Sequence, residues 1–328
     1  MPNYIETATI CQKELDTAAV ADTCTGWMDA NAENVIYDGG REVKIPKVTM
    51  DGLADYDTGN GYVEGDIEFR YQTETMTQDR GRGFTLDAAT TNETNYAANI
   101  SRVMGEFQRE HVIPEIDAYR ISKIASKILD ANKSKKIEGM CIGEQTLIAD
   151  TKVFKVLHAI KHGIAAIRNN YSGPLTIQIS TEVLTELEIE MVGRLSYIEI
   201  PKAGVMTKVP AIDMCPLIET PTSRMISSIT LKDGKTEGQK EGGWEKGSSA
   251  LDINFLILPT KAPIAVSKLD KFRIFDPETY QKATAWHADY RRYHDLWIPE
   301  NKLKVMYGSF KGKLPSESQE QEKQEGQA

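Results

Sequence analysis

Two pairs of histidines are the first candidates for chemistry in this chain. His158 and His162 stand four residues apart in a segment with helical periodicity, so both could face one metal ion. A zinc hydrolase of that type needs a glutamate directly after the first histidine, and Ala159 occupies this position. Polar surface histidines are therefore the favoured interpretation, and a cytosolic metal-dependent enzyme is the least favoured function. His287 and His294 lie in the aromatic stretch WHADYRRYHDLW, which favours packing against a core or a partner over catalysis.

Phosphate-binding and acid–base motifs are the next candidates, and each departs from the pattern that its chemistry requires. The segment Gly59-Asn60-Gly61 lacks the third glycine and the following helix of a dinucleotide site. Residues 238–248 contain glycines and Lys246, but not in the order of a P-loop. Glu64 and Asp66 would share one face of a strand, which in an acidic chain indicates a solvated face. The sequence therefore predicts no catalytic, cofactor-binding or metal-ligating residues.

The composition is that of a folded protein with an acidic balance. The chain has 328 residues, 40% of them hydrophobic and 27% charged, so it is long enough for two or three packed units. Its net charge of −9 argues against a dedicated nucleic-acid-binding surface, which would need clustered lysines and arginines. No apolar segment is long enough to span a membrane, and the start lacks the pattern of a secretion signal. The four cysteines are scattered without metal-ligand spacing, which indicates free thiols in a cytosolic protein.

Residues 36–88 have the alternation and the turn residues of a long antiparallel ribbon. The segments 42–48 and 62–73 alternate apolar and polar residues, and the turn formers at 57–61 include an Asn-Gly pair, a strong hairpin signal. An isolated two-stranded ribbon is marginal in water. We therefore expect this ribbon to lie on another surface, such as a neighbouring subunit. Residues 1–35 are only weakly periodic and predict an extended or partly helical arm.

Two long helices are predicted after the ribbon. Apolar residues recur at helical spacing over residues 97–131, which corresponds to a rod of about 45 Å. Pro114 either starts a second helix within this stretch or kinks one long helix. The next helix is predicted at 146–169, and Gly173-Pro174 prevents it from continuing.

Short strands and loops follow the helices. Strands are predicted at 175–179, 196–200, 211–219, 254–258 and 264–266. The Gly- and charge-rich segment 232–249 predicts a flexible surface loop. A closing hairpin is predicted from strands at 290–297 and 303–307 around a turn at 299–301, and the tail 313–328 is predicted to be disordered. Helices and strands are segregated along the chain, which predicts an α+β fold.

The segment Thr77–Phe84, TQDRGRGF, places Arg80 and Arg82 among glycines at the point where the ribbon rejoins the helical body. Glycines allow the backbone to change direction, and the planar guanidinium of arginine can pair with a carboxylate on a neighbour. A hinge or an inter-subunit contact is therefore favoured here over an ordinary turn.

The stretch Arg80–Lys127 resembles a group of tailed-bacteriophage major capsid proteins. In that group an arginine-containing turn, FxLD, a helix ending in EFxRxxVxPEIDAYR and a long spine helix follow one another. The matching residues are Phe84, Leu86, Asp87, Glu106, Phe107, Arg109, Val112, Pro114, Glu115, Asp117, Tyr119 and Arg120. Val209–Met225 is similar to a strand–loop segment of the family that ends in Pro-x-Ser-Arg-Met, and Tyr293–Ser309 is similar to its closing hairpin. Together these segments cover most of residues 36–310.

The resemblance implies the tailed-phage capsid fold, which is shared in outline with herpesvirus shells. The implied parts are an N-terminal arm (1–35), an extended loop (36–88), a peripheral domain with the spine helix and returning strands (89–137 and about 256–312), a mainly axial domain (138–255) and the tail (313–328). The residues expected at inter-subunit contacts are Asn60, Gly61, Arg70, Arg80, Arg82 and Phe84. Those expected to pack the spine helix are Phe107, Pro114, Ile116, Tyr119 and Ile124.

The function implied by the resemblance is that of a structural subunit and not of an enzyme. We expect a homo-oligomer whose hexamers and pentamers form an icosahedral shell around packaged double-stranded DNA, with maturation of a procapsid. The shell would assemble in the host cytoplasm, become part of the virion, and have no membrane or cofactor. Expected partners are portal and scaffolding proteins, with weak and non-specific DNA contacts. Because only about 35 residues precede the ribbon, a separate scaffold is favoured over a fused one. The alternative is an encapsulin-like nanocompartment shell.

Overall fold

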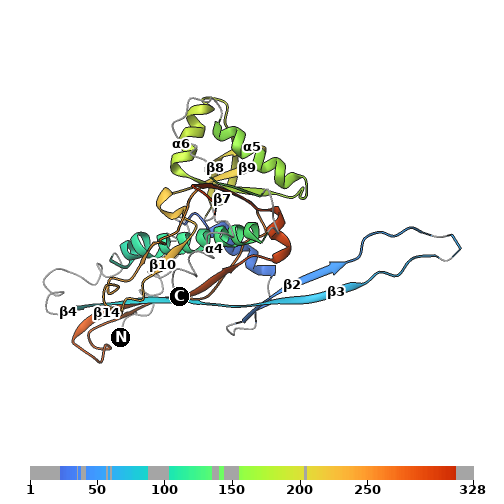
Figure 1. The fold of residues 1–328 in the computed structure, drawn as a ribbon. Coiled ribbons are helices and arrows are strands. Elements are labelled where there is room, and N and C mark those ends of the chain that lie inside the picture. Colours follow the sequence, from blue (N-terminus) through green and yellow to red (C-terminus); the bar gives the residue numbers. More distant parts are fainter. Residues whose placement is uncertain are drawn as a thin grey trace, which may run out of the picture.

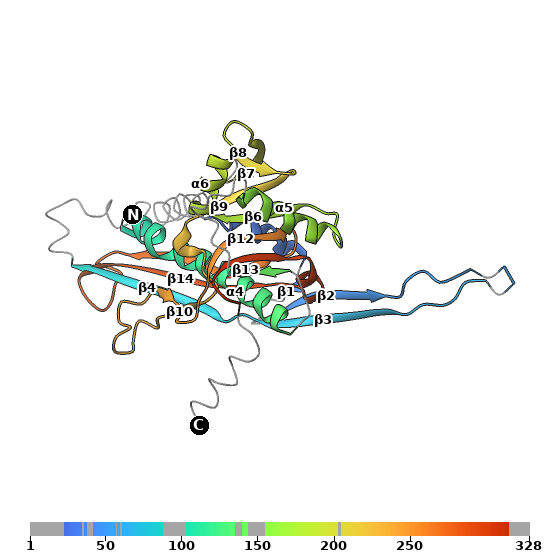
Figure 2. The ribbon, with the colours of Figure 1, turned by 45° about the horizontal axis from the view of Figure 1, so that its top comes forward.

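The computed structural model describes residues 23–34, 36–37, 42–56, 58–59, 61–87, 103–134, 140–143, 155–202 and 205–314. The predictions for the arm before residue 23, for the start of the first long helix and for the tail after residue 314 lie outside this part of the chain. The molecule has a long central helix, α4, with a compact unit on one side of it and a flat sheet along the other. A two-stranded ribbon extends far from this body (Figure 1; Figure 2).

Helical elements and strands are mixed without the regular βαβ alternation of an α/β fold, and most strand pairs are antiparallel, as in an α+β fold. The helical elements are η1 (Gly26–Asn34), η2 (Gln108–Val112), α4 (Ile113–Lys133), α5 (Lys155–Arg168), α6 (Thr181–Glu190), η3 (Thr222–Arg224) and η4 (Glu300–Val305). The strands are β1 (Ile36–Tyr37), β2 (Glu42–Met50), β3 (Ile67–Thr75), β4 (Gln78–Asp87), β5 (Cys141–Ile142), β6 (Leu175–Ser180), β7 (Ser196–Lys202), β8 (Val205–Ile212), β9 (Cys215–Thr220), β10 (Ile229–Leu231), β11 (Trp244–Lys246), β12 (Asp252–Pro259), β13 (Ile264–Phe275), β14 (Ala285–Trp297) and β15 (Tyr307–Lys311).

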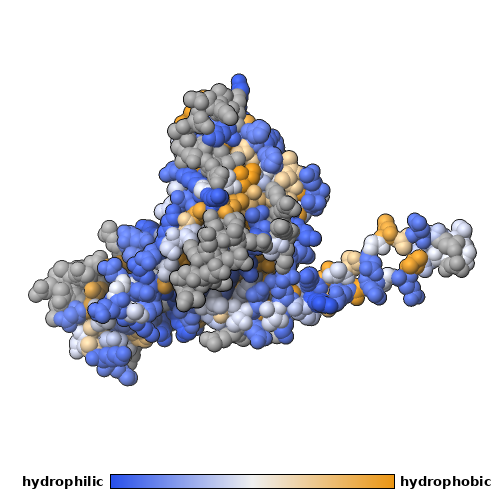
Figure 3. Space-filling model, viewed as in Figure 1, coloured by the Kyte–Doolittle hydropathy of each residue, from blue (hydrophilic) through white to orange (hydrophobic). Residues whose placement is uncertain are grey.

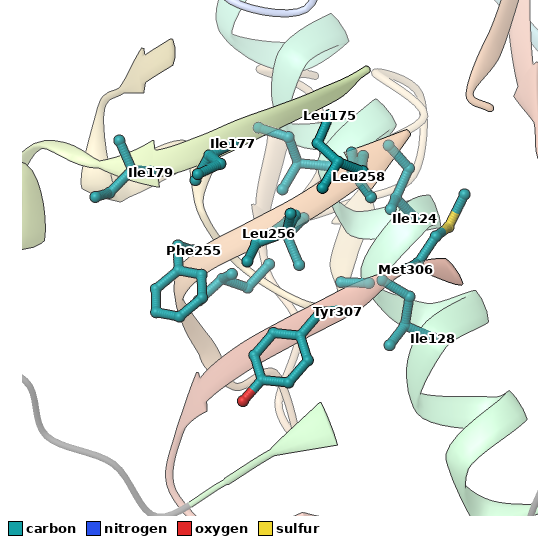
Figure 4. Close-up of a cluster of buried hydrophobic side chains, with 14 of the residues drawn as sticks. Ile124, Ile128, Leu175, Ile177, Ile179, Phe255, Leu256, Leu258, Met306 and Tyr307 are labelled. Carbon is teal, nitrogen blue, oxygen red and sulfur yellow. The ribbon is translucent and has the colours of Figure 1, made fainter. Parts of the chain in front are cut away.

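The main core surrounds a seven-stranded sheet with the strand order β5-β15-β12-β6-β9-β8-β7. Every residue of β6 is buried, and its polar side chains are accommodated by hydrogen bonds, such as that from Gln178 to the hydroxyl of Thr220. Figure 4 shows how α4 contributes Ile124 and Ile128 to the same cluster as side chains from β6, β12 and β15. The buried side chains of α5 and α6 join this cluster as well. Ile124, which was predicted to pack the spine helix, is fully buried there.

A second, three-stranded sheet lies along the other side of α4, in the order β13-β14-β4. Strand β4 pairs with β14 over its whole length, from Asp87 opposite Ala285 to Gln78 opposite His294. Residues 78–87 were assigned to the extended loop from the sequence, and in the structure they form an edge strand of this sheet. The free-standing part of the ribbon therefore consists of β2, β3 and the residues between them.

The central helix is continuous across Pro114. Residues 103–107 are α-helical, η2 is a π-helical turn, and α4 follows with the proline in its first turn. Proline has no N–H to donate and its ring collides with the carbonyl of the preceding turn. A π-helical turn widens the backbone, so the chain keeps its direction where a regular helix would break.

The predicted closing hairpin is wrong. Strand β14 pairs with β13 and β4, whereas β15 pairs with β12 and β5 in the other sheet. The residues between them form the 3₁₀-helix η4, which carries the chain from one sheet to the other. Strand β15 begins only at Tyr307, so residues 303–305 of the predicted second strand are 3₁₀-helical. Alternation also does not specify which strand is the partner.

Two further differences concern the compact unit of α5, α6 and β7–β9. The segment 211–219 was predicted as one strand, and the structure turns it into a hairpin of β8 and β9 through Asp213 (φ 50°) and Met214 (φ 62°). Neither residue is the glycine or asparagine that signals such a turn. Helix α6 was not predicted, because its sequence TEVLTELEIE follows a strand directly and includes four β-branched residues.

Candidate functional site

The ribbon presents different side chains to the body at its root and to solvent further out. In β2, Val43 and Ile45 are 0% and 4% exposed and pack in a small cluster with Met76 and Trp297. These two residues point to one face of the ribbon, because side chains alternate along a strand. They fix the root of the ribbon on the three-stranded sheet.

Further out, the opposite face of the ribbon becomes apolar. Val48 lies directly across from Phe69, and Met50 lies across from Ile67. These four side chains are 41–69% exposed. Cross-strand apolar pairs of this kind stabilise a ribbon only modestly, and they leave a continuous apolar strip in water.

The exposed large apolar side chains of the described residues are concentrated on this ribbon. Nine of fifteen belong to it: Val48, Met50, Leu53, Tyr56, Tyr62, Val63, Ile67, Phe69 and Tyr71. Figure 3 shows orange, hydrophobic patches along the extension, between hydrophilic ones. A contiguous apolar surface on a soluble protein marks an interaction site. The sequence carries a signal for this strip, since Val48 and Met50 alternate in antiphase to the buried Val43 and Ile45 of the same strand.

The ribbon also carries polar and charged side chains of both signs. Arg70, an expected contact residue, lies on the face opposite the strip, pairs with Glu68 and has a side chain that is 73% exposed. Gly61 adopts φ +84°, which favours glycine, and Asn60 lies outside the described residues. The outer part of the ribbon, residues 51–66, contains five acidic residues and no lysine or arginine.

A buried carboxylate on the central helix holds the segment that leads into η1. Asp117 is 0% exposed and accepts five hydrogen bonds. Four come from the hydroxyls of Thr23 (2.7 Å) and Thr25 (2.5 Å) and from the backbone N–H groups of Cys24 and Thr25 (3.1 Å each). The fifth comes from the guanidinium of Arg224 in η3, at 2.9 Å. Asp117 therefore joins three parts of the chain at one point.

A second buried carboxylate holds the junction where the ribbon rejoins the body. Asp295 in β14 accepts hydrogen bonds from the N–H and the hydroxyl of Thr77 (2.9 Å each), just before β4 begins. It also accepts one from Tyr119 (2.8 Å) and forms an ion pair with Lys123, both on α4. Burial and the charge of Asp295 raise the pKa of Tyr119, so its hydroxyl remains a donor. This junction fixes the direction in which the ribbon leaves the molecule.

The two arginines among glycines lie within a strand and not at a hinge. Arg80 forms a two-point ion pair with Glu115 on α4, at 2.7 and 3.0 Å. It also donates to the backbone carbonyls of Lys232 (2.7 Å) and Gly243 (3.0 Å). Because side chains alternate, both arginines face the helix, while Gly81 and Gly83 face outward. A Cβ at Gly81 would come within 2.7 Å of the carbonyl of Tyr290, which explains the glycine there.

The segment 232–243 is ordered, which differs from the prediction of a flexible loop. Asp233 accepts three hydrogen bonds from Lys235 and Thr236, and these lower the pKa of its carboxyl to about 2. The segment closes the β10–β11 hairpin and rests on β4, where Arg82 donates to the carbonyl of Lys240 at 3.3 Å. The composition of the segment indicated flexibility. Its contacts with Arg80 and Arg82, which lie about 150 positions earlier in the chain, could not be seen from that composition.

Replacing Arg80 with alanine should release this hairpin from the body. Its guanidinium holds Glu115 and two hairpin carbonyls, and a hydrogen bond to a charged group contributes about 1.5–3 kcal/mol. We expect hydrogen exchange of the amides in 232–243 to accelerate at least ~10-fold, whereas exchange in α5 stays unchanged. Arg70→Ala is the control, because this exposed arginine forms its ion pair with Glu68 on the same strand and lies far from the hairpin. Equal protection of the hairpin in Arg80→Ala and wild type would contradict the assignment.

The other expected packing residues meet around the start of the central helix. Phe84 and Phe107 are in edge-to-face contact, with ring centroids 5.0 Å apart, and Phe107 also contacts Tyr290 at 6.4 Å. Ile116 is 6% exposed. Phe84, an expected inter-subunit contact, thus packs against the helix of its own chain.

The histidines lie in unrelated places. His158 and His162 are exposed on α5, and the part of the chain that the structure describes holds no cluster of three metal-ligating side chains. His287 stacks on Tyr280, with ring centroids 4.6 Å apart. His294 is 4% exposed in β14, where burial, followed by the nearby cations headed by Arg292, lowers its pKa well below the ordinary value.

Acid should destabilise the protein through His294. Its pKa is lowered in the folded state, so the unfolded chain binds the proton more tightly. The stabilising effect of a neutral His294 is complete above about pH 6.5 and declines as the pH falls, by up to about 1.4 kcal/mol per pH unit. His294→Phe should flatten the stability profile between about pH 6.5 and 5 in chemical denaturation. The control His158→Gln, on an exposed face, should leave the stability profile unchanged. An equal slope in wild type and in His294→Phe would show that His294 does not cause the loss of stability in acid.

Comparison with known proteins shows the fold to which this arrangement belongs. No family model and no curated protein sequence matches the chain. Solved structures do match. A structure from Mycobacterium phage Cain has a TM-score of 0.53 at 8% identity and covers 87% of this chain and 90% of its own. The mature capsid of bacteriophage PhiM1 gives 0.52 at 8% identity, with 85% of each chain covered.

A structure from Mycobacterium phage Adephagia also gives a TM-score of 0.52 at 8% identity, covering 88% of this chain and 91% of its own. The protein therefore has the fold of tailed-phage capsid proteins, as the sequence predicted. Among the described helices, none is both long and apolar enough to cross a membrane.

Proposed function

We propose that this protein is the major capsid protein of a tailed bacteriophage and that it assembles into an icosahedral shell around packaged double-stranded DNA. The observation that carries the proposal is the apolar strip on the ribbon. Val48, Met50, Ile67 and Phe69 line one face of an extension that has no core of its own on that side. Such a surface is costly in water unless a partner covers it. The capsid fold makes a second copy of the chain the fitting partner.

In this proposal the ribbon is the extended loop of the capsid fold, and it lies across the neighbouring subunit. The strip is at one end of the molecule, so the contact joins two different surfaces of identical chains. A heterologous contact of this kind forms a closed ring when the rotation that it imposes between neighbouring subunits divides a full turn. Hexamers and pentamers are rings of this type. The unit of α5, α6 and β7–β9 serves as the axial domain, and α4 with the three-stranded sheet serves as the peripheral domain.

The charge of the chain suits containment of DNA and not tight binding to it. The net charge is −9, and the outer ribbon carries only acidic charges. We therefore propose weak, non-specific DNA contacts, with portal and scaffolding proteins as the specific partners and the virion as the location. Arg70 and Gly61, on the exposed ribbon, remain proposed inter-subunit contacts. The role is structural and involves no catalytic step.

Electron microscopy of the purified full-length chain, alone and co-expressed with candidate scaffolding proteins, tests this proposal. The expected result is rings, shells or tubes of regular subunits. A chain that remains monomeric in sedimentation under all these conditions, with its fold intact by circular dichroism, would overturn it.

A further inference from the structure

A cavity of about 430 Å³ lies beneath the start of the central helix, between η1, α4, β13 and β14. Its walls include two arginines from different elements, Arg120 of α4 and Arg292 of β14. Arg120 is 1% exposed, and the side chain of Arg292 is 16% exposed. A cavity that contains two guanidinium groups this deep in a protein is unusual, because isolated charges are rarely buried.

In each guanidinium group the Nη atoms have hydrogen-bond partners, whereas the Nε–H donor has none within the described part of the chain. The Nη atoms of Arg120 donate to Asp29 at 2.6 and 3.0 Å and to the carbonyl (3.1 Å) and hydroxyl (3.4 Å) of Thr25. Those of Arg292 contact Asp270 (2.8 Å) and Ser267 (3.2 Å). The Nε atoms of both arginines are buried, and neither has a hydrogen-bond acceptor among the described residues. Buried donors of charged groups are seldom left without an acceptor.

The carboxylates do not fill this role. The side chains of Asp29 and Asp270 are 42% and 34% exposed, so they lie toward solvent while the guanidinium groups lie deeper. The unused side of a guanidinium, formed by Nε and one Nη, matches two oxygens of a carboxylate or phosphate. The volume is sufficient for one such group together with water.

We propose that this cavity binds a small oxyanion, of the phosphate or carboxylate class, between Arg120 and Arg292. The anion accepts the two Nε–H donors and ties together η1, the central helix and the three-stranded sheet. Because each arginine already has a carboxylate partner, the affinity is modest, on the order of 1 mM for inorganic phosphate. This site is independent of the apolar strip and does not rest on the proposed capsid function.

Thermal unfolding of the full-length protein with inorganic phosphate is the test. Buffers of matched ionic strength contain either chloride alone or about 10 mM phosphate, a tenfold excess over the expected dissociation constant. The variants are Arg292→Gln and the matched control Arg291→Gln. Arg291 is the next residue of β14, points to the opposite face, pairs with Asp79 and has a side chain that is 61% exposed.

Phosphate should raise the Tm of wild type and of Arg291→Gln by about 2 °C more than that of Arg292→Gln. General salting effects act on all three proteins alike, so the difference isolates binding in the cavity. If Arg292→Gln does not fold, Arg292→Lys is used in its place, because lysine keeps the charge but cannot bind an oxyanion through two parallel hydrogen bonds. Phosphate should raise the Tm of Arg292→Lys by less than half of its effect on wild type. Equal shifts in all proteins would mean that water fills the cavity and would overturn the proposal.

Discussion

Replacing Phe69 with glutamate is expected to stop the chain from assembling while leaving its body folded. Phe69 is 66% exposed near the middle of the apolar strip, opposite Val48. A charge in a covered apolar contact is desolvated without a partner, which costs several kcal/mol. In the proposed shell the contact recurs at every subunit, so the loss would multiply through the assembly. We expect assembled material in sedimentation to fall at least ~10-fold, with the Tm of the unassembled chain within about 2 °C of the wild-type subunit.

The matched control for Phe69→Glu is Thr49→Glu. Thr49 lies in β2 beside Val48 and Met50 but points to the polar face, directly across from Glu68. It introduces the same charge at the same distance from the body, and assembly should decrease much less. Similar losses in both variants would mean that added negative charge, and not the apolar strip, governs assembly. Normal assembly of Phe69→Glu would show that the apolar strip is not part of the contact between subunits.

Replacing Asp117 with alanine is expected to be the most destabilising change in the body. Its carboxylate is fully buried and holds Thr23, Thr25 and Arg224 through short hydrogen bonds. Removing it leaves a guanidinium and backbone N–H groups buried without acceptors, which typically costs about 3–5 kcal/mol. We expect a corresponding decrease in the free energy of unfolding, measured in urea, and loss of protection in residues 23–34 by hydrogen exchange.

Asp130→Ala provides the comparison within the same helix. Asp130 is exposed near the end of α4, so its replacement should change the free energy of unfolding by no more than about 0.5 kcal/mol. If Asp117→Ala also changed the free energy of unfolding by no more than about 0.5 kcal/mol, the segment leading into η1 would be held by other contacts. Assembly measurements on the same variants separate a folding defect from an interface defect.

Periodicity predicted the local elements, since it is a property of neighbouring residues. The ribbon, the central helix and the buried strand β6 were all predicted from it, and each lies close to the expected range. Partner choice was not predictable in this way. Strand β4 was assigned to the ribbon because it follows β3 directly, yet it pairs with β14, more than 200 residues later.

The polar contacts of the site were even less accessible from the sequence. Asp117 was noted only as part of a resemblance, because its donors lie in residues 23–25 and at Arg224, about 90 to 107 positions away. The contact of Arg80 with Lys232 spans an even larger separation, 152 positions, and is equally hidden in the sequence. Composition alone suggested a hinge at residues 77–84 and a flexible loop at 232–249. The contacts of Arg80 with Glu115 and with Lys232 show instead a strand and a hairpin that is fixed to it.

The strand order of the seven-stranded sheet has a consequence for synthesis of the chain. Strand β15, residues 307–311, lies between β12 and β5 and is the last strand of the described residues to be synthesised. Until it leaves the ribosome, one edge of β12 has no partner, and Tyr307 and Phe310 are missing from the core. An unpaired inner strand edge favours aggregation or degradation. Prematurely terminated chains would therefore be removed before they could enter an assembly in which one defective copy affects its neighbours.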